Sequence, residues 1–227
     1  MADVTKFISG IENFRQQHFG ENAELATDLL AGQKPQALLI GCCDSRVDPA
    51  LLTECAPGDL FVLRNIANLV PPYKKDNDYH GVSSSIEYAV CYLKVTDIIV
   101  LGHSHCGGIG ALMQSVEGQE EGEFISKWVN IAAPARDKVL REMAGADAEK
   151  QARACEKEAI LVSLKNLLTF PWVKDRTARG QLTLHGWYYN IGSGQLKHYN
   201  PLNGAFEVLV ERYSPDLINV NEASPIA

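Results

Sequence analysis

Two short segments of the chain carry its most reactive side chains. One contains Cys42, Asp44 and Arg46, and the other contains His103 and Cys106. A histidine and a cysteine three residues apart in a turn can converge on one metal ion, and zinc binds both imidazole nitrogen and thiolate sulfur. Cys42 would supply a third ligand and leave the fourth tetrahedral position open to water, as in catalytic zinc sites. The spacing therefore predicts a catalytic zinc site.

The aspartate and the arginine that follow Cys42 indicate a further role for that segment. Asp44 and Arg46 are close enough in sequence to form an ion pair, which beside a metal would keep the carboxylate ionised as a hydrogen-bond acceptor. Two alternatives remain open. Ser104 lies in Gly102-His-Ser-His-Cys106, which approximates the G-x-S-x-G turn of serine hydrolases but ends in cysteine. A non-catalytic zinc-binding interaction module is the other alternative.

These segments need a scaffold that brings them together. Short apolar runs predict buried strands, and apolar residues at helical spacing predict helices in the segments between the strands. The strands are expected at 36–41, 60–64, 97–101 and 181–187, and the helices at 82–93, 108–116, 123–142 and 148–169. This alternation favours an α/β fold with a central, mostly parallel sheet flanked by helices. Both reactive segments follow a strand, so they should meet at the carboxyl edge of the sheet, where ligands bind.

The two ends of the chain depart from this pattern. An N-terminal helical arm, a hairpin at the sheet edge and a loosely held tail are expected at residues 1–31 (helices at 3–19 and 21–31), 195–210 and 214–227. A terminal arm of this kind often packs on a neighbouring subunit. We expect residues 1–227 to form a single domain, because the chain is shorter than the length at which cores divide.

Composition excludes several classes of protein. The 227 residues include 21 lysines and arginines against 28 aspartates and glutamates, a formal charge of −7. Such a chain has no bulk attraction to nucleic acid or to an anionic membrane. No apolar run approaches the ~20 residues of a membrane span, and the first residues lack the features of a secretory signal or transit peptide. We therefore expect a cytoplasmic protein whose six cysteines are reduced.

The motifs together resemble one enzyme family. C-x-D-S-R, followed about sixty residues later by G-H-S-x-C-G-G, is similar to the β-class carbonic anhydrases, and the chain resembles their plant-like bacterial branch. Further segments that carry the resemblance are Pro57–Phe61, Arg64–Asn68, Gly81–Tyr88 and Cys155–Ala159. The resemblance extends from about residue 30 to about residue 210.

The resemblance implies reversible hydration of CO₂ to bicarbonate and a proton by a zinc-bound hydroxide. It implies one Zn²⁺ per chain, held by Cys42, His103 and Cys106, and an Asp44–Arg46 dyad that orients the hydroxide. The implied substrate pocket is built across a dimer interface, so the protein should be a homodimer or a higher homo-oligomer. The implied pocket residues are Gln33, Phe61, Ile66, Tyr88 and Gly107. Relatives of this fold that hydrolyse CS₂ or COS with the same ligands are an alternative.

One position departs from a regulated subset of the family. That subset has tryptophan three residues before its first zinc cysteine and tends to bring the aspartate onto zinc at low pH, whereas this chain has Leu39. We therefore expect a constitutively open site. The remaining cysteines and one histidine of the motifs receive no role; they are Cys43, Cys55, Cys91, Cys155 and His105.

Overall fold

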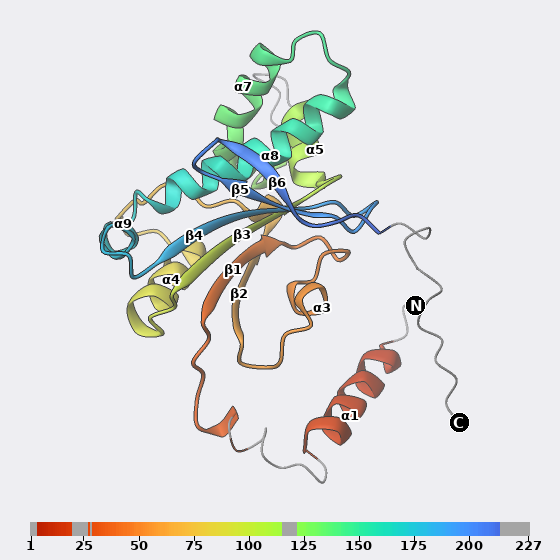
Figure 1. Cartoon of the computed structure of the whole chain (residues 1–227). Coiled ribbons are helices and arrows are strands. Elements are labelled where there is room, and N and C mark those ends of the chain that lie inside the picture. The colour runs from red at the N-terminus through yellow and green to blue at the C-terminus, as the bar shows by residue number, and fades with distance from the viewer. Residues whose placement is uncertain (1–3, 20–26, 28, 115–121, 214–227) are drawn as a thin grey trace.

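The computed structural model describes residues 4–19, 27, 29–114 and 122–213. Its centre is a six-stranded sheet in the order β2-β1-β3-β4-β5-β6 (Figure 1). The strands are β1 (Ala37–Cys42), β2 (Leu60–Asn65), β3 (Asp97–His103), β4 (Thr183–Tyr189), β5 (Leu196–Asn200) and β6 (Ala205–Val210). The first four strands are parallel, and β5 and β6 form an antiparallel hairpin at one edge. The predicted fold class is confirmed.

Helices connect and cover these strands. They are α1 (Thr5–Phe19), α3 (Pro49–Thr53), α4 (Gly81–Glu87), α5 (Gly107–Gln114), α6 (Ile125–Val129), α7 (Ala133–Glu142), α8 (Ala148–Leu167) and α9 (Pro171–Ala178). Three short turns of other helix types are η1 (Ile66–Asn68), η2 (Tyr88–Tyr92) and η3 (Asn130–Ala132).

Two of the predicted helices differ in detail from those observed. The helix expected at 82–93 begins as α4 and continues as the π-helix η2. The helix expected at 123–142 consists of α6, η3 and α7, because Pro134 in the first turn of α7 lacks the N–H that a continuous helix needs. The sequence did not predict α3 or α9, which also begin with proline. The helix expected at 21–31 lies mostly outside the described residues, and the tail from 214 lies wholly outside them.

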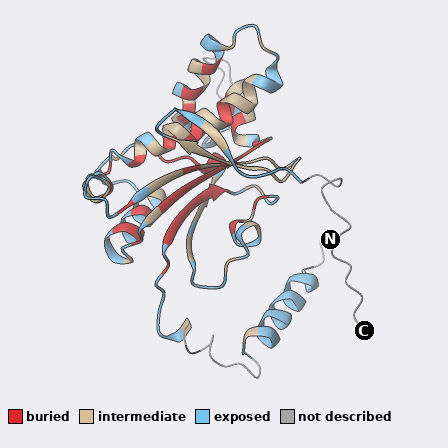
Figure 2. Ribbon diagram, in the orientation of Figure 1, coloured by how far each residue is buried: buried red, intermediate tan, exposed pale blue. Residues whose placement is uncertain are grey.

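The core is centred on β1 and β3. All six residues of β1 and six of the seven residues of β3 are buried, as expected for strands that are covered on both faces. On one face Leu38, Ile40, Ile98 and Val100 pack with residues of α4, α8 and α9. On the other face the cluster contains Leu39, Ile99 and Leu101. Figure 2 shows this buried centre in red.

Helix α8 lies close to the sheet because two strands have glycine beneath it. A Cβ atom on Gly102 of β3 would be 2.7 Å from Ile160 Cδ1, and one on Gly186 of β4 would be 3.0 Å from Ile160 Cγ2. Any side chain at Gly102 would force Ile160 to move. The two glycines therefore set how near α8 lies to the ends of β3 and β4.

Helix α1 stands apart from the rest of the protein. None of its residues is buried, and Figures 1 and 2 show it as an exposed helix away from the sheet. Its apolar face remains uncovered, with Phe7 63% exposed and Ile11 69% exposed. The helical arm predicted for this region is therefore present, with an apolar face that has no covering within the described chain.

Candidate metal centre

The three predicted metal ligands come together at the carboxyl edge of the sheet. Cys42 ends β1, His103 ends the neighbouring parallel strand β3, and Cys106 immediately precedes α5. Their ligand atoms all lie within 4.8 Å of one another, and all three residues are buried. Strand pairing accounts for the nearness of the first two, because β1 and β3 are adjacent parallel strands in which Gly41 pairs with Leu101, so both strands end at the same edge of the sheet.

The imidazole of His103 is prepared to bind a cation. Its Nδ1 lies 2.9 Å from the Ser104 carbonyl oxygen and donates a proton to it, which leaves Nε2 as the nitrogen with a free lone pair. Nε2 is buried and has no hydrogen-bond partner. A buried polar atom without a partner is costly in a native fold. Two sulfurs and this nitrogen form a ligand set that suits zinc.

One of the two thiols, that of Cys42, is poised to lose its proton. A hydrogen bond with Cys106 lowers the pKa of Cys42, and the same bond raises the pKa of Cys106, because the pair retains one proton between them. Backbone N–H groups supply further stabilisation of negative sulfur. The Asp44 N–H donates to Cys42 Sγ at 3.4 Å, and the Ala67 N–H also bonds to Cys42. Ala67 adopts a left-handed conformation with φ 62°, a conformation that residues other than glycine rarely adopt.

The dyad predicted beside the ligands forms a bidentate ion pair. Arg46 donates from Nε to Asp44 Oδ1 at 2.9 Å and from Nη2 to Oδ2 at 2.7 Å. Hydrogen bonding from Arg46 holds the pKa of Asp44 well below its usual range. Arg46 also reaches the carbonyl oxygen of His105 at 3.1 Å, so the pair connects both reactive segments. Asp44 Oδ2 lies 3.9 Å from His103 Nε2.

Sequence reasoning missed the residue that anchors this loop. Arg64 on β2 donates to the carbonyl oxygens of Cys42 and Asp44, each at 2.8 Å, and to Asp48 Oδ2 at 2.6 Å. Asp48 also caps α3 through its other carboxylate oxygen. One guanidinium therefore joins the first ligand, the dyad and the start of a helix. The sequence offered one signal for this role: Arg64 is the single charged residue in the apolar run at 60–64.

The predicted pocket residues fall into two groups. Ile66 follows the end of β2, where Asn65 pairs with Cys42, and Gly107 follows Cys106, so both lie at the ligand end of the sheet. A Cβ atom on Gly107 would meet nothing within 4 Å. Ile66 is 38% exposed. These two residues are placed where a substrate bound at this chain's own metal centre could contact them.

The other three predicted pocket residues lie toward the opposite end of the sheet. Phe61 pairs with Leu38, four residues before Cys42, which corresponds to about 13 Å along the strand. The rings of Phe61 and Tyr88 are 5.8 Å apart between centroids, and Tyr88 is 45% exposed. Gln33 is exposed and precedes the start of β1. The structure therefore brings Phe61 and Tyr88 together but does not bring Gln33 to the metal ligands of the same chain.

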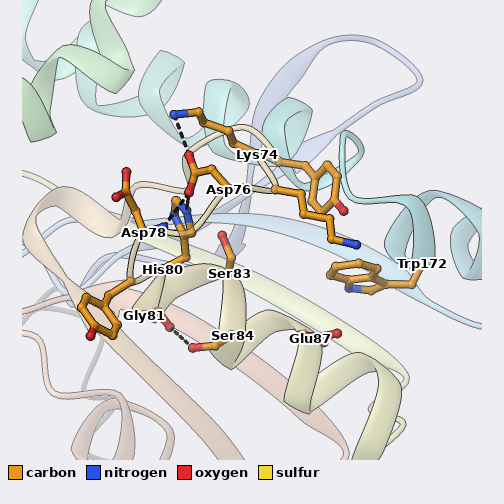
Figure 3. A pocket seen from close by; sticks show the side chains of 12 residues that line it. Lys74, Asp76, Asp78, His80, Gly81, Ser83, Ser84, Glu87 and Trp172 are labelled. Atoms are coloured by element: carbon orange, nitrogen blue, oxygen red, sulfur yellow. Dashed lines mark hydrogen bonds and ion pairs between the residues drawn. The ribbon is translucent and has the colours of Figure 1, made fainter.

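A separate cavity of about 610 Å³ lies beside α4 (Figure 3). Its lining comes from residues 73–87 and from Trp172, and it includes none of the predicted ligands or dyad residues. Asp76 accepts from Lys74 at 2.6 Å and contacts His80 at 2.5 Å, so its carboxylate is already occupied by the protein's own cation and imidazole. The predicted metal ligands and the Asp44–Arg46 dyad therefore lie outside this cavity.

The geometry disfavours the serine hydrolase alternative. Ser104 is only 1% exposed, and its Oγ accepts a hydrogen bond from the Ile191 N–H at 2.9 Å. A nucleophile must be accessible to its substrate and activated by a neighbouring base. The hydroxyl of Ser104 instead joins the end of β3 to the segment that follows β4.

The mostly parallel sheet and its helices make this an α/β protein. The two thiols and the imidazole at the carboxyl edge of the sheet give it the ligand set of a zinc centre. A family model described as carbonic anhydrase matches residues 37–196. A carbonic anhydrase of Synechocystis is 39% identical over 197 residues, which cover 87% of this chain and 71% of the relative.

Solved structures agree with the sequence relatives. The β-carbonic anhydrase CcaA has 38% identity and a TM-score of 0.84, with 92% of each chain covered. A tetrameric β-carbonic anhydrase of Sordaria macrospora has 26% identity and a TM-score of 0.72, with 92% of this chain and 96% of that chain covered. The chain belongs to the carbonic anhydrase family, in its β class. It is an enzyme, and the family relationship and the Cys-His-Cys cluster support CO₂ hydration.

Proposed function

We propose that this chain hydrates CO₂ reversibly with one Zn²⁺ held by Cys42, His103 and Cys106. The observation that carries the proposal is the convergence of three buried ligand atoms within 4.8 Å, with a free lone pair on the histidine. When bound, zinc supplies the Lewis acidity that lets water ionise near neutral pH and act as a nucleophile.

The dyad is proposed to orient the attacking water. Asp44, kept ionised by Arg46, accepts a hydrogen bond from that water, so the oxygen lone pair is directed at the carbon of CO₂. Both carboxylate oxygens of Asp44 are engaged by Arg46, which supports the constitutively open site expected from Leu39. The N–H of Gly107 is proposed to stabilise negative charge that develops on the CO₂ oxygens.

The substrate pocket is proposed to be completed by a second subunit. Gln33, Phe61 and Tyr88 are displaced from the metal ligands of their own chain, so we infer that they line the site of a partner, while Ile66 and Gly107 line their own. The uncovered apolar face of α1 supports association, since exposed apolar patches mark interfaces. A homodimer is the smallest assembly that meets this requirement, and the related Sordaria macrospora enzyme is tetrameric.

A reducing compartment is proposed because the metal centre requires free thiols. All six cysteines are free in the structure, and we propose a cytoplasmic location. None of the helices in the described part of the chain has the length and apolarity needed to cross a membrane. We further propose that residues 1–227 act as a single domain.

Metal analysis combined with stopped-flow CO₂ hydration tests this proposal. We expect one zinc per chain and fast CO₂ hydration, and Cys42→Ser should lose zinc and activity together. Turnover of CS₂ or COS in place of CO₂ would instead support the hydrolase alternative. Bound zinc without turnover of any of the three would support an interaction module, and a purified protein unable to bind zinc would refute the proposal.

A further inference from the structure

One buried carboxylate next to the metal ligands has no part in the proposed mechanism. Glu156 on α8 is 2% exposed. Its Oε1 accepts from the Cys106 backbone N–H at 3.0 Å and from Arg153 Nη2 at 2.8 Å, and its Oε2 accepts from the Tyr188 hydroxyl at 2.8 Å. Three donors from three parts of the chain therefore meet on one side chain.

The bond to Cys106 is the one that concerns the metal centre. Cys106 immediately precedes α5, where backbone N–H groups have no carbonyl acceptor within the helix. Cys106 is also buried, so water is a poor substitute acceptor, and a buried donor left without a partner is unfavourable. The preceding residue, His105, has φ 57°, which is unusual for a residue other than glycine. The Cys106 N–H therefore depends on an acceptor from elsewhere in the fold, and Glu156 supplies it.

Helix α8 is held firmly enough to act as a platform for this bond. Ile160, one turn after Glu156, packs against Gly102 and Gly186, where added side chains would clash. Farther along the helix, Ser163 Oγ donates to the Asn68 carbonyl oxygen at 3.2 Å, which fixes the end of η1. The same helix thus supports both the loop that carries Cys106 and the loop whose Ala67 N–H reaches Cys42.

We propose that Glu156 is a positioning residue for the metal centre. Its carboxylate holds the Cys106 backbone so that Cys106 Sγ meets Cys42 Sγ and His103 Nε2 in a geometry that zinc can use. The inference rests on the proposed zinc site. Groups that support metal ligands in this way typically change metal affinity by about 10- to 100-fold when removed.

The test compares zinc affinity among folded variants, measured by competition with a chelator, with circular dichroism as the check of folding. Glu156→Ala should bind zinc about 10- to 100-fold more weakly than the wild type. Glu156→Gln should stay close to the wild type, because the amide oxygen can accept from Cys106 while the amide nitrogen donates to the Tyr188 hydroxyl. Glu158→Ala, on the same helix but paired with Lys138 at 2.8 Å, is the matched control and should bind zinc normally.

Cobalt substitution gives a second readout that does not depend on turnover. The sulfur-to-cobalt charge-transfer band of Glu156→Ala should shift or weaken, whereas that of Glu156→Gln should not. Wild-type affinity and an unchanged band in folded Glu156→Ala would overturn the proposal. Equal weakening in the Ala and Gln variants would overturn it too, since the role would then belong to charge rather than to hydrogen bonding.

Two further outcomes remain decisive. If Glu156→Ala does not fold, Tyr188→Phe, which removes one support of the carboxylate, should still weaken zinc binding measurably, and wild-type affinity in that variant would refute the inference. If the wild-type protein itself binds no zinc, the proposed function fails rather than the role of Glu156 alone.

Discussion

The loop that carries Cys42, the first proposed metal ligand, depends on Arg64, and Arg64→Lys tests that dependence. The guanidinium makes three bonds, to the carbonyl oxygens of Cys42 and Asp44 and to the carboxylate of Asp48. A lysine ammonium is a single point of charge and cannot reproduce this fork. We expect one of the three bonds to survive.

The size of the effect follows from the two lost bonds. Hydrogen bonds to charged groups contribute about 1.5–3 kcal/mol each when well protected. The side chain of Arg64 is 26% exposed and that of Asp48 is 37% exposed, so water replaces part of the loss. A net destabilisation of about 1–3 kcal/mol should lower Tm by about 3–10 °C for a chain of this size. A shift of the loop by about 1 Å would lower kcat/KM by up to about 100-fold.

Thermal unfolding, chelator competition and stopped-flow hydration together check this expectation. Arg176→Lys is the matched control, because Arg176 donates to the carbonyl oxygens of Val90 at 2.8 Å and Gln181 at 3.0 Å, away from the ligands. The control should lose stability but keep wild-type zinc affinity. The reasoning fails if Arg64→Lys keeps wild-type kcat/KM, or if both variants change zinc affinity equally.

Three further predictions concern other parts of the molecule. Asp44→Asn should lower kcat by about 100-fold at unchanged zinc content, because a neutral amide is a weaker acceptor than the ionised carboxylate and its NH₂ group can only donate; full activity in a stopped-flow assay would contradict the dyad role. Gly108→Ala should lower Tm, because its Cβ would be 2.6 Å from an Ile66 methyl carbon, at a cost of about 1–3 kcal/mol; an unchanged Tm would contradict the clash. Burial raises the pKa of Asp97, but hydrogen bonds from His185 and Thr96 outweigh it and lower that pKa. Because its folded pKa is depressed, Asp97 stabilises the fold above the unfolded value of about 3.9, and this stability is lost as pH falls through the folded value. In His185→Gln the free energy of unfolding should therefore fall less steeply as the pH is lowered into the acid range. The same steepness as in the wild type would refute the role given to His185.

The cluster of Cys42, His103 and Cys106 was predictable because its signals are local. Apolar runs mark strands through burial, and in a parallel sheet the residues after two neighbouring strands must meet at one edge. Cys42 and His103 needed only that rule, and Cys106 needed only a turn of three residues. The four parallel strands and the edge hairpin followed from the same kind of pattern.

Helix boundaries were less predictable because tertiary packing competes with local preference. Periodicity at 123–142 indicates a helical stretch, but not that it divides into three pieces around Pro134. The π-helical turn η2 adds a residue per turn without a distinct composition. Short helices such as α3 fall below the length at which periodicity can be recognised.

The sequence by itself determined the chemistry proposed for this protein: which side chains could bind zinc, which carboxylate lies beside them, and what kind of sheet brings them together. Only the tertiary structure decided what holds that chemistry in place. Arg64 lies 22 residues from Cys42 in the chain, and Glu156 lies 50 residues from Cys106. Such contacts arise from the relative placement of whole elements, set for α8 by glycines in β3 and β4. No local pattern encodes them, because hydrogen bonds between distant segments depend on three-dimensional distance and leave no periodic trace in the chain.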